Sequence, residues 1–202
     1  MLTAAEAFDR LRDGNARFAS GQSEVVTGPT RRAELVTSQE PFAVVLGCAD
    51  SRVPAEIVFD QGLGDLFVIR VAGNIVAPSQ VDSVEFAVGR FGTPLVVVLG
   101  HTRCGAVQAT VDALTNPTED SRQLASIVNR VRPAVESVLA SSANQDTEAV
   151  LRDAVRANIR TSVERLRSGS EKLRYLTDDA HVVVVGAEYS LETGVVDFLS
   201  DA

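Results

Sequence analysis

The chain has 202 residues and a formal net charge of −8, with 45% hydrophobic and 23% charged residues. These proportions are those of one globular domain, and they exclude a disordered chain, a collagen-like chain and a coiled coil. The excess of acidic groups argues against a surface for nucleic acid or an anionic membrane, so neither is expected as a partner.

The first forty residues predict a helical arm that precedes the main fold. Apolar residues recur at helical spacing over 3–18, and Thr3 with Glu6 has the form of a capping box at the start of that helix. A second short helix is expected over 31–38. Residues 1–40 are therefore interpreted as an N-terminal arm.

The rest of the chain predicts strands that alternate with helices. Continuous apolar runs rich in β-branched residues are typical of strands buried on both faces, and they occupy residues 42–47, 66–70, 94–100 and 181–187. Helical patterns cover residues 79–91, 104–115, 121–140 and 146–168. After a turn at Gly194, the last apolar segment can return as an antiparallel edge strand. We therefore expect an α/β fold of one domain, residues 1–202, with four parallel strands, a C-terminal antiparallel edge strand and helices on the flanks.

Two of the predicted strands end in the same tetrapeptide, V-V-L-G, and side chains able to bind a metal follow each one. Cys48 and Asp50 follow the first strand, and His101 and Cys104 follow the second. In open α/β sheets, ligands bind beyond the carboxyl ends of the strands, where these four side chains would meet. Two thiols, an imidazole and a carboxylate form a plausible tetrahedral zinc site, so one zinc ion per chain is predicted.

Arg52 gives the aspartate of this group a second possible partner. It lies two residues beyond Asp50, close enough for a bidentate pair between guanidinium and carboxylate. With Asp50 on the metal the site would be closed. With Asp50 on Arg52 the fourth position would open to water, whose pKa zinc lowers to about 7.

The motifs C-A-D-S-R at 48–52 and H-T-R-C-G at 101–105 resemble those of the β-class carbonic anhydrases. Gln39, R-V-A-G-N at 70–74 and V-E-F-A-V at 84–88 also occur in the order typical of that family. The resemblance therefore covers nearly the whole chain. It implies a parallel sheet with an antiparallel extension, and a homodimer wrapped by N-terminal arms that can pair into a homotetramer.

The resemblance also implies the reaction and the residue roles. Zinc-bound hydroxide would convert carbon dioxide reversibly to bicarbonate and a proton. Cys48, His101 and Cys104 would hold the zinc ion, and Asp50 would be an exchangeable ligand switched by Arg52. The substrate pocket would be lined by Gln39 from across the dimer interface and by Phe67, Ala72, Gly73, Asn74, Phe86 and Gly105.

The chain departs from the family pattern at two positions. Val45 replaces the tryptophan of members that carry an inhibitory bicarbonate pocket, and the chain contains no tryptophan. Phe86 replaces a pocket tyrosine found in plant-like members, so a hydroxyl contact is missing there. The resemblance therefore does not extend to that form of bicarbonate regulation.

Two other functions remain open from the sequence. The same scaffold could hydrolyse carbon disulfide or carbonyl sulfide, because the same nucleophile would attack a linear sulfur substrate. Alternatively, a permanently closed site of two cysteines, one histidine and one aspartate would be a structural zinc centre. Substrate competition would distinguish the sulfur-substrate hydrolase from a carbonic anhydrase. The structural zinc centre predicts bound metal without turnover.

The location predicted from the sequence is the cytoplasm. The N-terminal residues lack the apolar region of a secretory signal, and no run of about eighteen apolar residues could span a bilayer. Two cysteines are also too few for a disulfide framework and fit metal binding in a reducing compartment.

Overall fold

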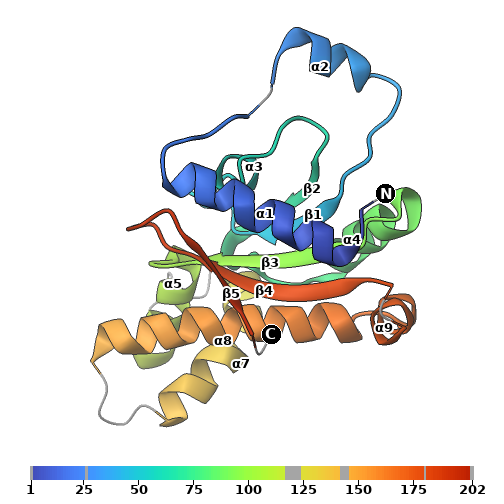
Figure 1. Ribbon diagram of the computed structural model, residues 1–202. Coiled ribbons are helices and arrows are strands. Elements are labelled where there is room, and N and C mark those ends of the chain that lie inside the picture. Colours follow the sequence, from blue (N-terminus) through green and yellow to red (C-terminus); the bar gives the residue numbers. More distant parts are fainter. Residues whose placement is uncertain (1, 26, 117–123, 142–145, 180, 201–202) are drawn as a thin grey trace.

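The computed structural model describes residues 2–25, 27–116, 124–141, 146–179 and 181–200. A five-stranded sheet in the order β2-β1-β3-β4-β5 forms its centre (Figure 1). The strands are β1 (Ala43–Gly47), β2 (Leu66–Arg70), β3 (Leu95–His101), β4 (Val183–Tyr189) and β5 (Val196–Leu199). The pairs β1–β2, β1–β3 and β3–β4 are parallel, and β5 runs antiparallel to β4. The predicted fold class is therefore confirmed.

Helices cover both faces of this sheet (Figure 1). They are α1 (Ala4–Ala19), α2 (Pro29–Glu34), α3 (Ala55–Val58), α4 (Pro78–Phe91), α5 (Gly105–Thr115), α7 (Ala125–Ser141), α8 (Thr147–Ser168) and α9 (Glu171–Asp178), with a short 3₁₀ turn η1 (Ala72–Asn74). Side chains of α1 and α3 pack in the core on one face, and those of α4, α5, α7, α8 and α9 pack on the other. No helix in these ranges is long and apolar enough to cross a membrane.

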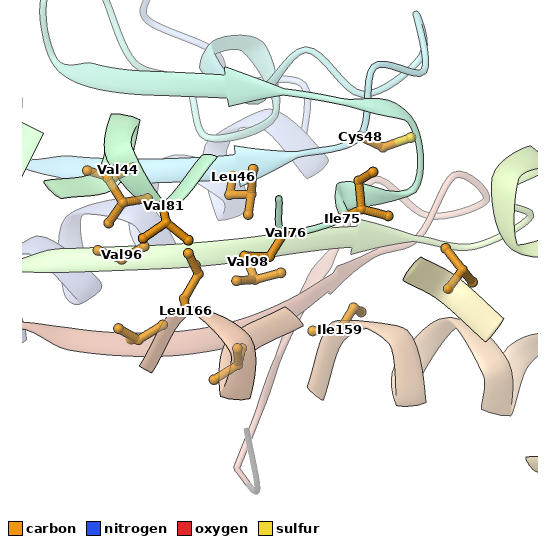
Figure 2. Close-up of a cluster of buried hydrophobic side chains, with 14 of the residues drawn as sticks. Val44, Leu46, Cys48, Ile75, Val76, Val81, Val96, Val98, Ile159 and Leu166 are labelled. Carbon is orange, nitrogen blue, oxygen red and sulfur yellow. The ribbon is translucent and has the colours of Figure 1, made fainter. Parts of the chain in front are cut away.

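The apolar runs of the central strands are explained by these two cores. Along β1, Val44 and Leu46 point into the core shared with α8, whereas Val45 points into the core shared with α1. Figure 2 shows Val44 and Leu46 on β1 and Cys48 just beyond its end, and all three belong to the larger core, which therefore reaches the carboxyl end of the strand. Strand β2 is only half-buried because it lies at the sheet edge, so burial on both faces was a wrong prediction for 66–70.

The first helix is attached to its own chain by specific contacts. The predicted capping box is present, since Thr3 accepts from the Glu6 amide and Glu6 accepts from the Thr3 amide. The Asn15 amide group donates to the carbonyl oxygens of Val58 and Gly194, at 3.0 and 2.9 Å. Helix α1 therefore forms a layer of this chain's fold, while α2 projects away from it (Figure 1).

Several boundaries differ from the predictions. The second helix spans Pro29–Glu34 instead of 31–38, because a proline is favourable in the first turn. The fourth strand begins at Val183 instead of 181, after the unpredicted helix α9. Helices α3 and η1 were also unpredicted, and each is too short to give a periodic pattern. The predicted helix 121–140 is observed from Ala125, and its residues 121–123 lie outside the described residues.

Gly14 offers a direct test of how α1 is attached. A Cβ atom at Gly14 would collide with the Phe59 carbonyl oxygen and come within 2.7 Å of Nε2 of Gln61. We expect Gly14→Ala to lower the free energy of unfolding by roughly 1–3 kcal/mol, because this overpacking outweighs the helix propensity of alanine. Urea denaturation would measure the change. Gly28→Ala is the control, since nothing lies within 4 Å of a Cβ there, and a stabilised Gly14→Ala would contradict this packing.

Candidate metal centre

Two neighbouring parallel strands bring the predicted zinc ligands together. Cys48 directly follows β1, His101 is the last residue of β3, and Cys104 is the N-cap of α5. The three side chains are buried, and one donor atom from each lies within 4.8 Å of the others. Figure 2 shows Cys48 at the carboxyl end of β1, where the parallel strands of such a fold place their ligands.

The imidazole of His101 is oriented for metal binding. Its side chain is fully buried, and Nδ1 lies 2.9 Å from the Thr102 carbonyl oxygen. A carbonyl can only accept, so Nδ1 carries the proton and Nε2 presents its lone pair. Nε2 has no hydrogen-bond partner, although a buried polar atom normally has one. An unpartnered imidazole nitrogen beside two thiols fits a zinc ion in ligand type and number.

The sulfur of Cys48 receives a backbone hydrogen bond from the 3₁₀ turn. The Gly73 amide donates to Sγ of Cys48 at 3.3 Å. Gly73 has φ +73°, and a Cβ there would come within 3.1 Å of Cβ of Ala106, so glycine suits this turn. The amide group of Asn158 on α8 donates to the Gly73 carbonyl oxygen at 2.8 Å and holds the turn in place. Asn158 was not predicted, because it acts through a backbone atom far away in sequence.

The pKa values of the two thiols are shifted in opposite directions. A hydrogen bond from Cys104 lowers the pKa of Cys48 to about 4, despite the opposing effect of burial. The same bond and burial raise the pKa of Cys104. Burial opposes protonation of His101, but the nearby Cys48 sulfur and its charge raise the His101 pKa overall. The contact between the two thiols therefore favours loss of the proton from Cys48 over loss from Cys104.

Asp50 is held by Arg52 in the predicted bidentate pair. Nε of Arg52 lies 2.9 Å from Oδ1, and Nη2 lies 2.7 Å from Oδ2. This contact holds the pKa of Asp50 well below its usual range. Oδ2 is 3.9 Å from Nε2 of His101, so the carboxylate borders the ligand group while paired with the arginine.

Arg70 fixes the backbone that carries both Cys48 and Asp50. Its Nε donates to the Cys48 carbonyl oxygen at 3.1 Å, and its Nη2 donates to the Asp50 carbonyl oxygen at 2.5 Å. The guanidinium therefore ties the end of β2 to the loop that follows β1. Its side-chain role was not predicted, because the sequence does not show which backbone atoms an arginine meets.

The predicted pocket residues fall into two groups. Ala72, Gly73 and Asn74 form η1 beside Cys48, and Gly105 begins α5 directly after Cys104. The second group lies away from the ligands.

Phe67, Phe86 and Gln39 make up that second group. Phe67 pairs in register with Val44, toward the end of β1 opposite Cys48, and its ring contacts Phe86 with a centroid distance of 6.2 Å. Gln39 lines a hollow of about 850 Å³ beside α2. This chain therefore does not bring these three residues to its own ligand group.

Comparison with known proteins decides the family. A family model described as carbonic anhydrase matches residues 43–196, a range that contains strands β1 to β4 and the three ligand candidates. This chain belongs to the carbonic anhydrase family. The resemblance predicted from the sequence is confirmed, and family membership supports carbonic anhydrase activity, the hydration of carbon dioxide.

Individual carbonic anhydrases show how far the similarity extends. A carbonic anhydrase of Mycolicibacterium smegmatis is 51% identical over 130 residues, which are 64% of this chain and 63% of that relative. Carbonic anhydrase 2 of Mycobacterium tuberculosis is 36% identical over 189 residues, 93% of this chain and 89% of that relative. The fold is also that of a tetrameric β-carbonic anhydrase from Sordaria macrospora, with a TM-score of 0.76 at 20% identity over 96% of this chain and 98% of that one.

Proposed function

We propose that the chain catalyses the reversible hydration of carbon dioxide to bicarbonate and a proton at a site holding one zinc ion per chain. Cys48, His101 and Cys104 would hold the ion. The observation that carries this proposal is the buried imidazole of His101, whose Nε2 has no hydrogen-bond partner and which has a ring nitrogen within 4.8 Å of both thiol sulfurs. Zinc in such a site supplies a nucleophile at neutral pH by lowering the pKa of water.

Asp50 and Arg52 would control access to the site. Three protein ligands leave a fourth position for substrate chemistry, as catalytic zinc sites require. The bidentate pair keeps Asp50 with Arg52, in the state that leaves this position open. In that state the ionised carboxylate of Asp50 can accept a hydrogen bond and so orient the donor group toward the substrate. Release from Arg52 would let Asp50 close the site.

Ala72, Gly73, Asn74 and Gly105 would line the pocket from the same chain, and Gln39, Phe67 and Phe86 would complete it across a dimer interface. Apolar groups at the proposed dimer interface are exposed in the single chain: Phe86 is 55% exposed, Val36 is 79% exposed and β2 is half-buried. A partner chain would cover them and fill the hollow beside α2. The arm, residues 1–40, would contribute α2 to this contact. The Sordaria relative is tetrameric, so two dimers of this chain can be expected to pair.

The dimer proposal predicts a monomeric, weakly active Phe86→Glu variant. A carboxylate in the interface would be buried without a partner, so the dimer should dissociate. The loss of Gln39 from the site should then reduce hydration per zinc ion. Light scattering after size exclusion measures the mass. Tyr175→Glu is the matched control, because Tyr175 is 64% exposed on α9; a dimeric Phe86→Glu of normal activity would contradict this interface.

The proposed single domain, residues 1–202, would work in the cytoplasm. Cys48 and Cys104 are free thiols, and zinc ligation by thiolates suits a reducing compartment.

The proposed function is tested by stopped-flow hydration of carbon dioxide with zinc quantified in the same sample. We expect hydration to rise between about pH 6.5 and 9, because the nucleophile that zinc supplies forms by loss of a proton. One zinc ion per chain without hydration at either pH would reject the proposal. It would then favour a carbon disulfide or carbonyl sulfide hydrolase, or a structural zinc centre.

A further inference from the structure

The two residues between the proposed ligands His101 and Cys104 are held by the turn that joins β4 to β5. The Thr102 amide donates to the Tyr189 carbonyl oxygen at 2.9 Å. The Thr102 hydroxyl accepts from the Leu191 amide at 3.0 Å and donates to Oε2 of Glu192 at 2.8 Å. Thr102 is therefore fixed through both its backbone and its side chain.

Glu192 also holds the next residue of this segment. Its Oε1 accepts from Nε of Arg103 at 2.7 Å, so each carboxylate oxygen has a different partner. The bonds from Arg103 and Thr102 lower the pKa of Glu192 to about 2, and the carboxylate stays ionised at neutral pH. One side chain thus holds both residues that separate the ligands.

The backbone of Arg103 explains why such a contact is useful. Arg103 has φ +55°, a left-handed conformation that is uncommon for a residue with a side chain. This conformation turns the chain between the end of β3 and the start of α5, and so sets the position of Cys104 relative to His101. A disfavoured conformation persists where the surroundings fix it. The Glu192 contact is such a restraint.

Thr102 also determines where the His101 ring points. Its carbonyl oxygen accepts a hydrogen bond from Nδ1, which leaves Nε2 without a hydrogen-bond partner and available to a metal. A group that fixes Thr102 therefore acts on the histidine through this hydrogen bond. Loss of the partners behind metal ligands commonly weakens metal binding by 10- to 100-fold.

We propose that Glu192 is a positioning residue of the metal centre, which holds the Thr102–Arg103 turn so that His101 and Cys104 meet zinc in one geometry. The inference rests on the proposed zinc site. Glu192 and Arg103 are 48% and 65% exposed in their side chains, so their ion pair contributes little to global stability. If Glu192 positions the ligands, its loss should therefore weaken zinc binding without lowering the stability of the zinc-free protein.

The test compares Glu192→Ala with the wild type in full-length protein. We expect about tenfold weaker zinc binding in competition with a chelator and an altered absorption spectrum of the cobalt(II) form. Unfolding of the zinc-free protein by urea should be unchanged. Thr102→Val should have a similar effect, and the double variant should be little worse than either single one, because both remove the same restraint. Glu148→Gln is the matched control, since Glu148 contacts Arg103 at 3.4 Å and belongs to α8.

Wild-type zinc affinity and an unchanged cobalt spectrum in Glu192→Ala would overturn the proposal. So would weaker binding that follows lower stability of the zinc-free protein, because that result indicates a structural role. Glu192→Gln keeps one acceptor oxygen, so its zinc affinity should lie between those of the wild type and Glu192→Ala. This variant replaces Glu192→Ala in the test if the alanine variant does not fold. Zinc binding by a wild type that does not hydrate carbon dioxide would reject the proposed function and leave this test intact.

Discussion

An Arg52→Ala variant is expected to keep one zinc ion per chain and to lose about a hundredfold in carbon dioxide hydration. Arg52 does not belong to the three-ligand group, so metal binding should survive its loss. Asp50 would lose the two hydrogen bonds that hold it away from the metal, and the carboxylate would be free to close the site. A displacement of about 1 Å in a catalytic group can itself reduce rates by about a hundredfold.

Two further variants make this result specific. Arg52→Lys retains the positive charge but not the planar fork, so it should restore only part of the hydration rate. Arg174→Ala removes an exposed arginine on α9 and should behave as the wild type. A zinc-replete Arg52→Ala enzyme with wild-type hydration would exclude control by this pair.

The sheet was predictable because burial leaves a simple pattern in sequence. The central strands β1 and β3 are covered on both faces, so every residue along them is apolar or glycine until the terminal His101. Helices α3 and η1 gave no such signal because they have four and three residues. Helix α9 has eight residues, and only Leu173 and Leu176 on it pack against the core, so its apolar stripe is too short to stand out in the sequence.

The ligand group was predictable for a different reason. Cys48 directly follows β1, His101 is the last residue of β3 and Cys104 is the N-cap of the next helix, so local spacing determines their placement once the strands are neighbours. Asn158 and Glu192 are linked to the site through Gly73 and Thr102, which belong to elements far from them in sequence. Such contacts depend on tertiary packing and leave no local pattern.

The attachment of α1 shows where sequence periodicity is insufficient. The spacing of apolar residues predicted an amphipathic helix, and Leu11 is indeed fully buried. Periodicity cannot state which surface the helix covers. That information comes from Gly14, which permits close approach to the Phe59 carbonyl oxygen, and from Asn15, which binds two backbone carbonyl groups.

Cys48→Ala is expected to abolish stoichiometric zinc binding and to reduce hydration to the uncatalysed rate. The substitution removes one of the three ligands, so only His101 and Cys104 would remain to hold the ion. Zinc content and hydration of purified protein measure the effect. Chelator-treated wild type is the control, because it should regain both properties with added zinc. A Cys48→Ala protein with one zinc ion per chain and normal hydration would contradict the ligand assignment.

The same centre predicts that zinc affinity of the wild type falls as the pH falls. Zinc requires deprotonated thiols and a neutral imidazole. The pKa of Cys104 is raised, so this thiol retains its proton at neutral pH, and binding must release at least that proton. The pKa of His101 is also raised. Below that pKa the imidazole is protonated, so zinc binding must then release a second proton. Affinity measured against a chelator should therefore change about tenfold per pH unit near neutrality and more steeply below it, whereas a pH-independent affinity would mean that the thiols are not the ligands.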